Sequence, residues 1–142
     1  MIEKITHDEQ LLAIIIYSNF KAEGIHFFTP DDFSQQLAYM NYPNGKVILP
    51  HKHNPINRSV QYTLEVLFIK KGKLRVDFYD NDQNYLESKT LSDGDVILLA
   101  SGGHGFKALE DLEMIEVKQG PYAGDSDKTR FNGIGSNEVK IS

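Results

Sequence analysis

Residues 61–79 read QYTLEVLFIKKGKLRVDFY, and this stretch decides the fold class. Valine, leucine, isoleucine and aromatic residues dominate both of its halves, as is typical of β-strands. The Lys71-Gly72 pair between the halves is a turn signal. The stretch therefore predicts an antiparallel hairpin, with strands at 61–69 and 73–79.

Similar segments occur along most of the chain. Further strands are expected at 11–17, 25–28, 47–53, 85–91, 95–100, 105–109 and 112–119. Turn sequences such as Ser92-Asp93-Gly94 separate them. Many short strands joined by turns are typical of a β-sandwich or a barrel, so the expected fold class is all-β.

A single short helix is expected between Thr29 and Pro43. Threonine is a favoured N-cap, and the proline that follows it is favoured at the first helical position. Apolar residues then recur at helical spacing, at Phe33, Leu37 and Met40. We expect this helix to pack on the outside of the β core.

Composition limits the classes of function. The chain has 142 residues, which predicts one domain over 1–142, and a net charge of −5, which argues against a nucleic-acid partner. The longest apolar run, Leu11–Tyr17, is too short to cross a bilayer, and the N-terminus lacks a signal-peptide layout. We expect a cytoplasmic protein with no membrane partner. Cysteine is absent, so any metal would need imidazole and oxygen ligands.

The histidines include one close pair, His51 and His53. Alternate side chains of a strand share a face, so both imidazoles would point the same way and form half of a metal site. The alternative is two polar residues at a strand end.

Two further residues could complete such a site. Glu65 lies in an apolar strand, where a carboxylate is seldom buried without a partner, although it could instead face solvent. His104 follows the apolar residues 96–100 in a glycine-rich turn, where the backbone can approach a site closely. The alternatives are an ordinary loop histidine, or a turn whose backbone N–H groups bind an anion.

Together these residues resemble the two sequence motifs of the cupin superfamily. The first motif consists of a glycine, five residues, His-x-His, a short spacer, a glutamate, six residues and a glycine. The matching residues are Gly45, His51, His53, Glu65 and Gly72. The second motif is matched in part between Gly94 and His104, so the resemblance covers about residues 45–119.

The chain also departs from the cupin pattern. Eleven residues separate His53 from Glu65, where cupins usually have three or four. In the second motif Ala100 replaces proline, one residue is missing between Gly102 and His104, and Ala108 replaces asparagine. Longer loops cost little free energy, so we retain Glu65 as a candidate ligand.

The resemblance implies a double-stranded β-helix, or jelly roll. Residues 1–44 would supply N-terminal strands and the short helix, 45–119 the barrel motifs, and 120–142 a C-terminal arm. The resemblance also implies one divalent transition metal (Fe, Mn, Ni, Co or Zn), held by His51, His53, Glu65 and His104.

Candidate substrate-binding residues lie mainly near the insertion 54–64, which we expect to hang over the barrel mouth. Its candidates are Arg58, Gln61 and Tyr62, with Tyr62 and Glu65 as catalytic candidates. On the strand 73–79, Arg75, Asp77 and Tyr79 alternate with Leu74, Val76 and Phe78. Either set could face inward, and the apolar set is favoured. Further candidates are Lys107, Glu116, Lys118 and Tyr122.

These features favour a metal-binding enzyme that isomerises or epimerises a small polar metabolite such as a sugar or sugar nucleotide. The alternatives are a non-catalytic cupin that binds a small molecule or metal, an Fe(II) dioxygenase, and a metal-free jelly roll whose histidines line a polar pocket. We also expect a homodimer, because the strand at Leu11–Tyr17 is apolar on both faces and would need a covering subunit.

Overall fold

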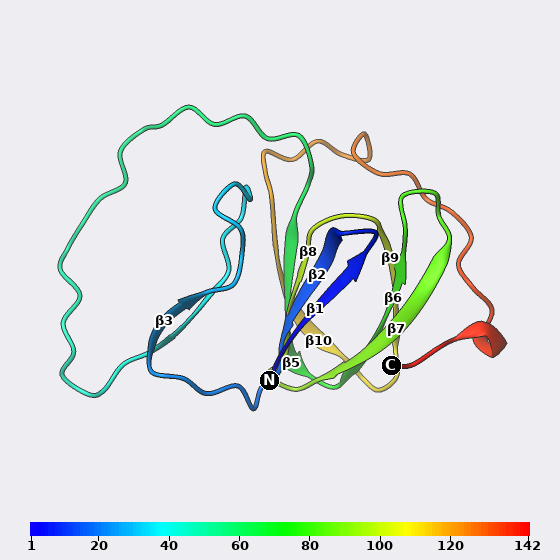
Figure 1. Ribbon diagram of the computed structural model, residues 1–142, viewed down its shortest axis with the longest axis horizontal. Coiled ribbons are helices and arrows are strands. Elements are labelled where there is room, and N and C mark those ends of the chain that lie inside the picture. Colours follow the sequence, from blue (N-terminus) through cyan, green and yellow to red (C-terminus); the bar gives the residue numbers. More distant parts are fainter.

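The computed structural model describes residues 1–142 and consists of β-strands and loops (Figure 1). Its strands are β1 (Ile2–His7), β2 (Gln10–Ile16), β3 (Gly24–Phe27), β4 (Ala38–Asn41), β5 (Glu65–Lys71), β6 (Lys73–Tyr79), β7 (Tyr85–Ser92), β8 (Val96–Leu99), β9 (Gly103–Ala108) and β10 (Glu113–Lys118). The only helical element is a 3₁₀ turn at Ser136–Glu138. The expected all-β fold class is confirmed. None of the helical structure has the length and apolarity needed to cross a membrane.

The strands form two larger sheets and a separate hairpin. The larger sheet has the order β1-β2-β8-β5-β10, and the smaller one has the order β7-β6-β9. Strands β3 and β4 pair only with each other. All neighbouring strands are antiparallel. Neither large sheet closes on itself, so β9 and β10 are both edge strands.

The core lies between the two large sheets. The larger sheet contributes Ile5, Leu12, Ala13, Ile15, Leu67, Ile69, Ile97 and Leu99, and the smaller sheet contributes Leu74, Val76, Phe78 and Leu91. Burying one such side chain contributes about 1.5–3 kcal/mol. The favoured orientation of β6 is thereby confirmed, because its apolar residues face this core. By the alternation of a strand, Arg75 and Asp77 point to the opposite face.

Strand β2 lies inside the larger sheet. It pairs with β1 on one side and β8 on the other, and Leu12 to Ile16 are buried within the chain itself. One face packs into the main core, while Ile14 joins a smaller cluster with Leu64 and Leu98. The apolar side chains of β2 are buried within one chain, so they do not require a second subunit and give no argument for a dimer.

The prediction of a helix between Thr29 and Pro43 is wrong, because these residues form a loop and the strand β4. The Gln36 amide instead donates to the Pro30 and Phe33 carbonyl oxygens at 2.9 and 3.0 Å, and its Oε1 accepts from Thr29. A compact loop thus satisfies backbone groups that a helix would satisfy internally. Phe33 and Leu37 pack on the Ile14 cluster, and β4 then pairs with β3. Tertiary packing overrides the local helical signals here.

The strand expected at 47–53 is also wrong. No backbone–backbone hydrogen bond involves residues 47–63, which run as an exposed loop (Figure 1). Strand β5 accordingly begins at Glu65 rather than at 61. Strands β1 and β4 were not expected from the sequence.

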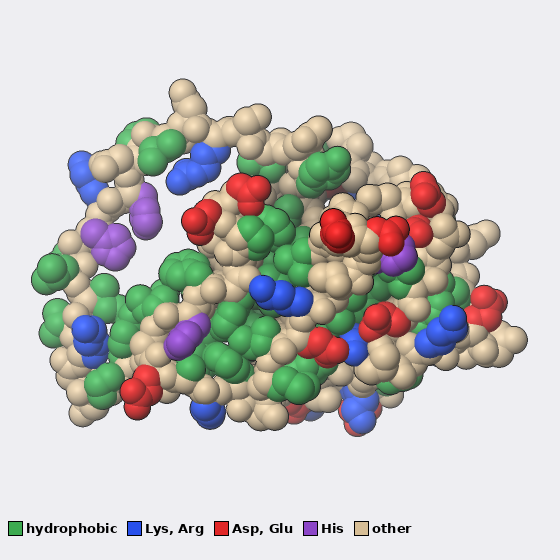
Figure 2. All heavy atoms as spheres, viewed as in Figure 1, with side chains coloured by type: hydrophobic (Ala, Val, Ile, Leu, Met, Phe, Trp, Pro, Cys, Tyr) green, Lys and Arg blue, Asp and Glu red, His purple; other side chains and the backbone are tan.

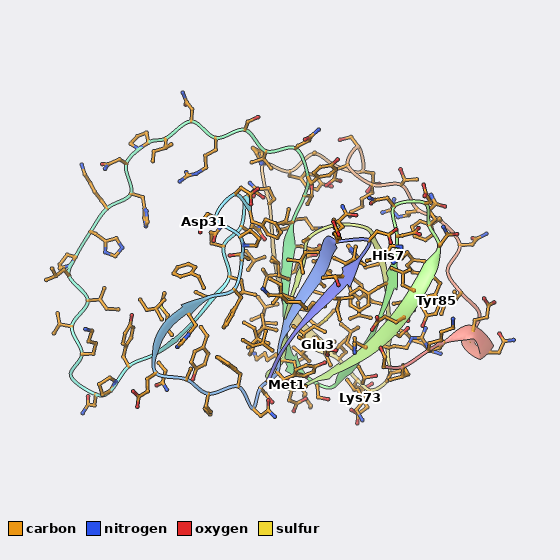
Figure 3. The ribbon with its side chains drawn as sticks, viewed as in Figure 1. Met1, Glu3, His7, Asp31, Lys73 and Tyr85 are labelled. Atoms are coloured by element: carbon orange, nitrogen blue, oxygen red, sulfur yellow. The ribbon has the colours of Figure 1, made fainter.

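The C-terminal residues 120–142 cross the smaller sheet and are tied to it. The Lys140 N–H donates to the Tyr85 hydroxyl at 2.7 Å, and Ile141 forms a bridge with Ser88. Figure 3 labels Tyr85 on β7. The Phe131 ring packs edge-on against Tyr79, with centroids 5.0 Å apart. This segment therefore covers the outer face of β6 and β7.

Candidate functional site

Glu65 points into the space between the two large sheets. It lies directly opposite Leu99 on β8 and Lys118 on β10. Residues directly opposite each other share a face of a sheet, and Leu99 belongs to the core. Glu65 is only 8% exposed, so the alternative that it faces solvent is wrong. A carboxylate at this position needs charged or hydrogen-bonding partners.

His104 reaches Glu65 from the other sheet. It lies opposite Phe78, which places it on the core face of β9. Its Nε2 is 2.8 Å from Glu65 Oε1. Because an ionised carboxylate only accepts hydrogen bonds, Nε2 carries the hydrogen in this contact. The pair therefore links the two sheets through a charge-assisted hydrogen bond.

The glycines before His104 allow β9 to begin close against β6. Gly102 has a φ of +72°, and a Cβ there would lie 2.5 Å from the Tyr79 carbonyl oxygen. A Cβ at Gly103 would lie 2.9 Å from the Phe131 ring. The close backbone approach expected of this turn is thus an approach to β6 and the C-terminal segment.

Two residues of β10 complete the group. Lys118 Nζ is 3.6 Å from Glu65 Oε2 and 3.4 Å from Glu116 Oε1. We call Glu65, His104, Glu116 and Lys118 the Glu65 cluster. Sequence reasoning named the two β10 residues without placing them. Their spacing of two indicates that both lie on one face of a strand, but it does not indicate which face.

The charges within this cluster shift the pKa values of its two carboxyl groups in opposite directions. The hydrogen bond from His104, aided by the Lys118 charge, lowers the pKa of Glu65 to about 2 in spite of its burial. The hydrogen bond with Glu65, together with burial, raises the pKa of Glu116. Burial lowers the pKa of Lys118, but the two carboxylates outweigh it and raise that pKa. Glu65 is therefore the carboxyl group that stays ionised, and Glu116 takes up a proton first.

A cleft of about 1280 Å³ opens beside the Glu65 cluster. Glu65, His104, Phe106 and Lys118 line it on the core side, and Arg75, Asp77, Tyr79 and Lys107 line it on the outer side of the smaller sheet. Because it borders both faces of β9, the cleft extends around the free edge of that strand. Its size exceeds that of a typical small-molecule site.

The predicted substrate-binding residues of the smaller sheet lie on the outer face of that sheet. Arg75 and Lys107 are directly opposite each other, on the face that points away from His104. The Arg75 guanidinium donates two hydrogen bonds of 2.9 Å to Asp77, which also accepts from Ser88. Arg75 is therefore engaged within the chain, whereas Lys107 forms no ion pair.

Two hollows border the loop candidates. Gln61 and Tyr62 line the main cleft and also a neighbouring hollow. Arg58 lines only the neighbouring hollow, which also borders Lys118 and the C-terminal candidate Tyr122. The expectation that the insertion 54–64 lies over the site therefore holds for its last residues only.

The predicted metal ligands are only partly brought together. His51 and His53 lie in the exposed loop, with their ring centroids 5.5 Å apart, and the Nδ1 of His51 is 3.0 Å from the Leu49 carbonyl oxygen. Figure 2 shows open space between this loop and the rest of the molecule. No three His, Asp or Glu side chains are grouped so that they could hold a metal ion. In this conformation the residues do not fit the four-ligand site that the resemblance implies.

Comparison with protein-family models, with curated proteins and with solved structures gives no match for this chain. The function must therefore be argued from the site. The Glu65 cluster holds an imidazole with one nitrogen fixed against a buried carboxylate, beside a large cleft. That arrangement suits a group that accepts and returns protons.

Proposed function

We propose that this chain is an enzyme that isomerises or epimerises a small polar metabolite, such as a sugar or a sugar nucleotide, with His104 as its acid–base group. The observation that carries the proposal is the 2.8 Å contact between His104 and the buried Glu65 at the wall of the cleft. A histidine whose ring is oriented by a carboxylate recurs in enzymes that transfer protons.

The proposed reaction is a proton transfer next to a carbonyl group. Glu65 accepts the Nε2–H of His104, which leaves Nδ1 free to remove a proton from the carbon beside the substrate carbonyl. The electron pair of the broken C–H bond forms an enediolate, and Lys118 keeps Glu65 ionised while His104 carries the added charge. In isomerisation, the hydroxyl on the deprotonated carbon passes its proton by way of Tyr62 to the former carbonyl oxygen, and His104 returns its proton to the former carbonyl carbon. In epimerisation, Tyr62 gives a proton to the opposite face of the deprotonated carbon, and His104 and Tyr62 then recover their starting protonation states from solvent. Tyr62, on the same cleft, is the proposed partner acid.

The cleft is lined by charged side chains of both signs, with a small excess of basic ones: Arg75, Lys107, Lys118, Lys128 and Arg130 against Asp32, Glu65, Asp77 and Asp127. Lys107 and Lys128 both line it, and neither has an acidic group within 4.0 Å. Unpaired basic side chains favour phosphate groups, in a chain whose net charge is −5. We therefore favour sugars that carry a phosphate or a nucleotide.

The test is solvent exchange. Sugar phosphates and keto nucleotide sugars are incubated with the protein in D₂O, and loss of the proton beside the carbonyl is followed by ¹H NMR. Wild type is expected to exchange at least one of them, and His104→Gln to slow that exchange by roughly 100-fold or more. His26→Gln, in the β3–β4 hairpin, is the matched control and should exchange normally. Equal exchange by wild type and His104→Gln would refute the role of His104, and binding without exchange would favour the non-catalytic alternative.

We further propose that the chain is a jelly roll of the cupin superfamily that binds a divalent transition metal. The support is the motif resemblance, the two facing antiparallel sheets, and the presence of an imidazole and a carboxylate at the cleft. Such a site needs His51 and His53 to approach His104, so no reaction step is assigned to the metal.

Elemental analysis of wild type and of a His51→Ala, His104→Ala double variant tests whether the chain binds a metal. Stoichiometric metal in wild type alone supports it, and iron would direct attention to O₂ consumption. No metal in wild type after reloading with each ion would overturn it.

A further inference from the structure

Strand β9 has a free edge beside the Glu65 cluster. It pairs only with β6, so the backbone groups along its other side have no strand partner. Phe106 and Leu109, at this edge, are 43% and 44% exposed. Proteins usually cover such edges, because an unpaired strand readily accepts another one. The cleft that extends around this edge provides the room for an added strand.

The chain also has a segment that suits this edge. We call residues 44–62 the arm. Val47, Ile48 and Leu49 are 73%, 59% and 79% exposed, and none of them takes part in a backbone hydrogen bond. Consecutive apolar residues with strand-forming preference are not typical of a solvated loop. The arm therefore has both the apolar surface and the free backbone of a strand that lacks its sheet.

We propose that two copies of this chain exchange their arms, so that residues 47–53 of each copy add as an antiparallel strand to the free edge of β9 in the other. The partner's His51 and His53 then lie beside His104 and Glu65. Each site would be built from two chains and would be incomplete in a monomer.

The chemistry of the two segments sets the direction and the register. In the antiparallel arrangement that places His53 opposite His104, Leu49 lies opposite Ala108 and Ile48 opposite Leu109. Phe106 then lies opposite His51 and diagonal to Leu49. A parallel strand with its histidines at His104 would carry Val47 past the start of β9, where no apolar edge is exposed. The antiparallel register is therefore the one that buries the exposed groups of both segments.

The placement of the arm favours a second copy over the arm's own β9. In Figure 1 the middle of the arm lies beyond the β3–β4 hairpin, whereas β9 belongs to the smaller sheet, which is the sheet farther from that loop. Only the last residues of the arm, including Gln61 and Tyr62, line the cleft beside β9. Five residues, 42–46, separate the end of β4 from Val47, and eleven, 54–64, separate His53 from β5. Fully extended, these flanks span roughly 17 and 37 Å, which lets the strand segment reach a neighbouring molecule. Exchange of identical elements between two copies is a low-cost route to a dimer.

Disulfide trapping tests this directly, because the chain has no cysteine of its own. Leu49→Cys is co-expressed with a size-tagged chain that carries Ala108→Cys, and the oxidised protein is separated on a non-reducing gel. Directly opposite strand residues lie at a Cα separation that a disulfide can bridge. We expect a covalent heterodimer from this pair. The control pair, Asn57→Cys with Ala108→Cys, should link only at background level, because residue 57 lies outside the added strand.

A single chain carrying both Leu49→Cys and Ala108→Cys decides between the two possible occupants. A covalent dimer supports exchange. A covalently closed monomer, or a mass near 16.1 kDa by light scattering of the unmodified protein, would overturn it. The inference does not rest on the proposed reaction, since the trap reports linkage between chains and is unaffected if the protein has no isomerase activity.

Discussion

The buried carboxylate of Glu65 couples the site to the stability of the fold. Its pKa is about 2 in the folded protein and near 4.5 when the group is free, so the ionised form is bound more favourably in the folded state. A lowered pKa of this kind contributes stability that is fully present above pH 4.5 and is lost as the pH falls toward 2.

Glu65→Gln removes this contribution while keeping the shape of the side chain. We expect the free energy of unfolding at pH 7 to fall by roughly 1–3 kcal/mol, because His104 and Lys118 lose a charged partner. Between pH 4.5 and pH 2, the free energy of unfolding should also fall less in the variant than in wild type. Urea denaturation at a series of pH values measures both effects. Glu113→Gln, an exposed change on the same β10 strand, is the control. If Glu65→Gln loses as much stability as wild type between pH 4.5 and pH 2, the lowered pKa of Glu65 does not stabilise the fold.

The candidate site could be predicted from sequence only where residue type carried the information. Glu65 and His104 were recognisable because a carboxylate in an apolar strand and a histidine after a glycine turn are both unusual. Their contact across two sheets depends on strand register, which the sequence does not show. Glu116 and Lys118 remained ambiguous for the same reason, since a period of two leaves open which face is buried.

At the scale of elements, the turn between β8 and β9 has little tolerance for a side chain. Gly102→Ala places a Cβ 2.5 Å from the Tyr79 carbonyl oxygen, at a φ of +72° that alanine disfavours. We expect the free energy of unfolding to fall by about 2 kcal/mol or more. Gly120→Ala, where a Cβ would meet nothing within 4 Å, should change it by less than about 0.5 kcal/mol. Equal stability of the two variants in urea denaturation would show that the turn adapts easily.

The C-terminal segment is held to β7 by a few polar contacts. The Tyr85 hydroxyl accepts the Lys140 N–H and lies 2.7 Å from Ser88 Oγ. Tyr85→Phe keeps the ring and removes these bonds, so the amides of Lys140 and Ser142 should exchange with solvent faster than in wild type. Hydrogen-exchange mass spectrometry measures this. Tyr39→Phe, in the β3–β4 hairpin, is the control, and unchanged protection of residues 139–142 in Tyr85→Phe would contradict the role of the hydroxyl.

The strands that were predicted correctly share one property. Around 61–79 and 85–100, apolar alternation and turn residues agree with the final packing, so local pattern and fold point the same way. Between Thr29 and Pro43 they disagree. Helix-start signals are present there, yet Phe33 and Leu37 gain more by packing on the Ile14 cluster. At 47–53 the strand pattern is present, but the chain offers the segment no neighbouring strand, and a strand without a ladder does not form.

At the scale of the whole molecule, the exposed arm and the free β9 edge predict that stability depends on protein concentration. If two chains exchange arms, association is part of folding, and the melting temperature should rise as concentration rises. Leu49→Asp places a charge in the added strand, where it would face the apolar end of the partner's β9. We expect this variant to be a monomer whose melting temperature no longer depends on concentration.

The far-UV circular dichroism of the Leu49→Asp variant should stay close to that of wild type, because Leu49 is exposed and lies outside both core clusters. Asn57→Asp adds the same charge elsewhere in the arm and should leave both mass and concentration dependence unchanged. Light scattering and thermal melts over a hundredfold concentration range separate the outcomes. If Leu49→Asp and wild type have the same mass and the same melting curves, the exposed apolar residues of the arm do not hold two chains together. The free edge of β9 would then have to be covered in another way.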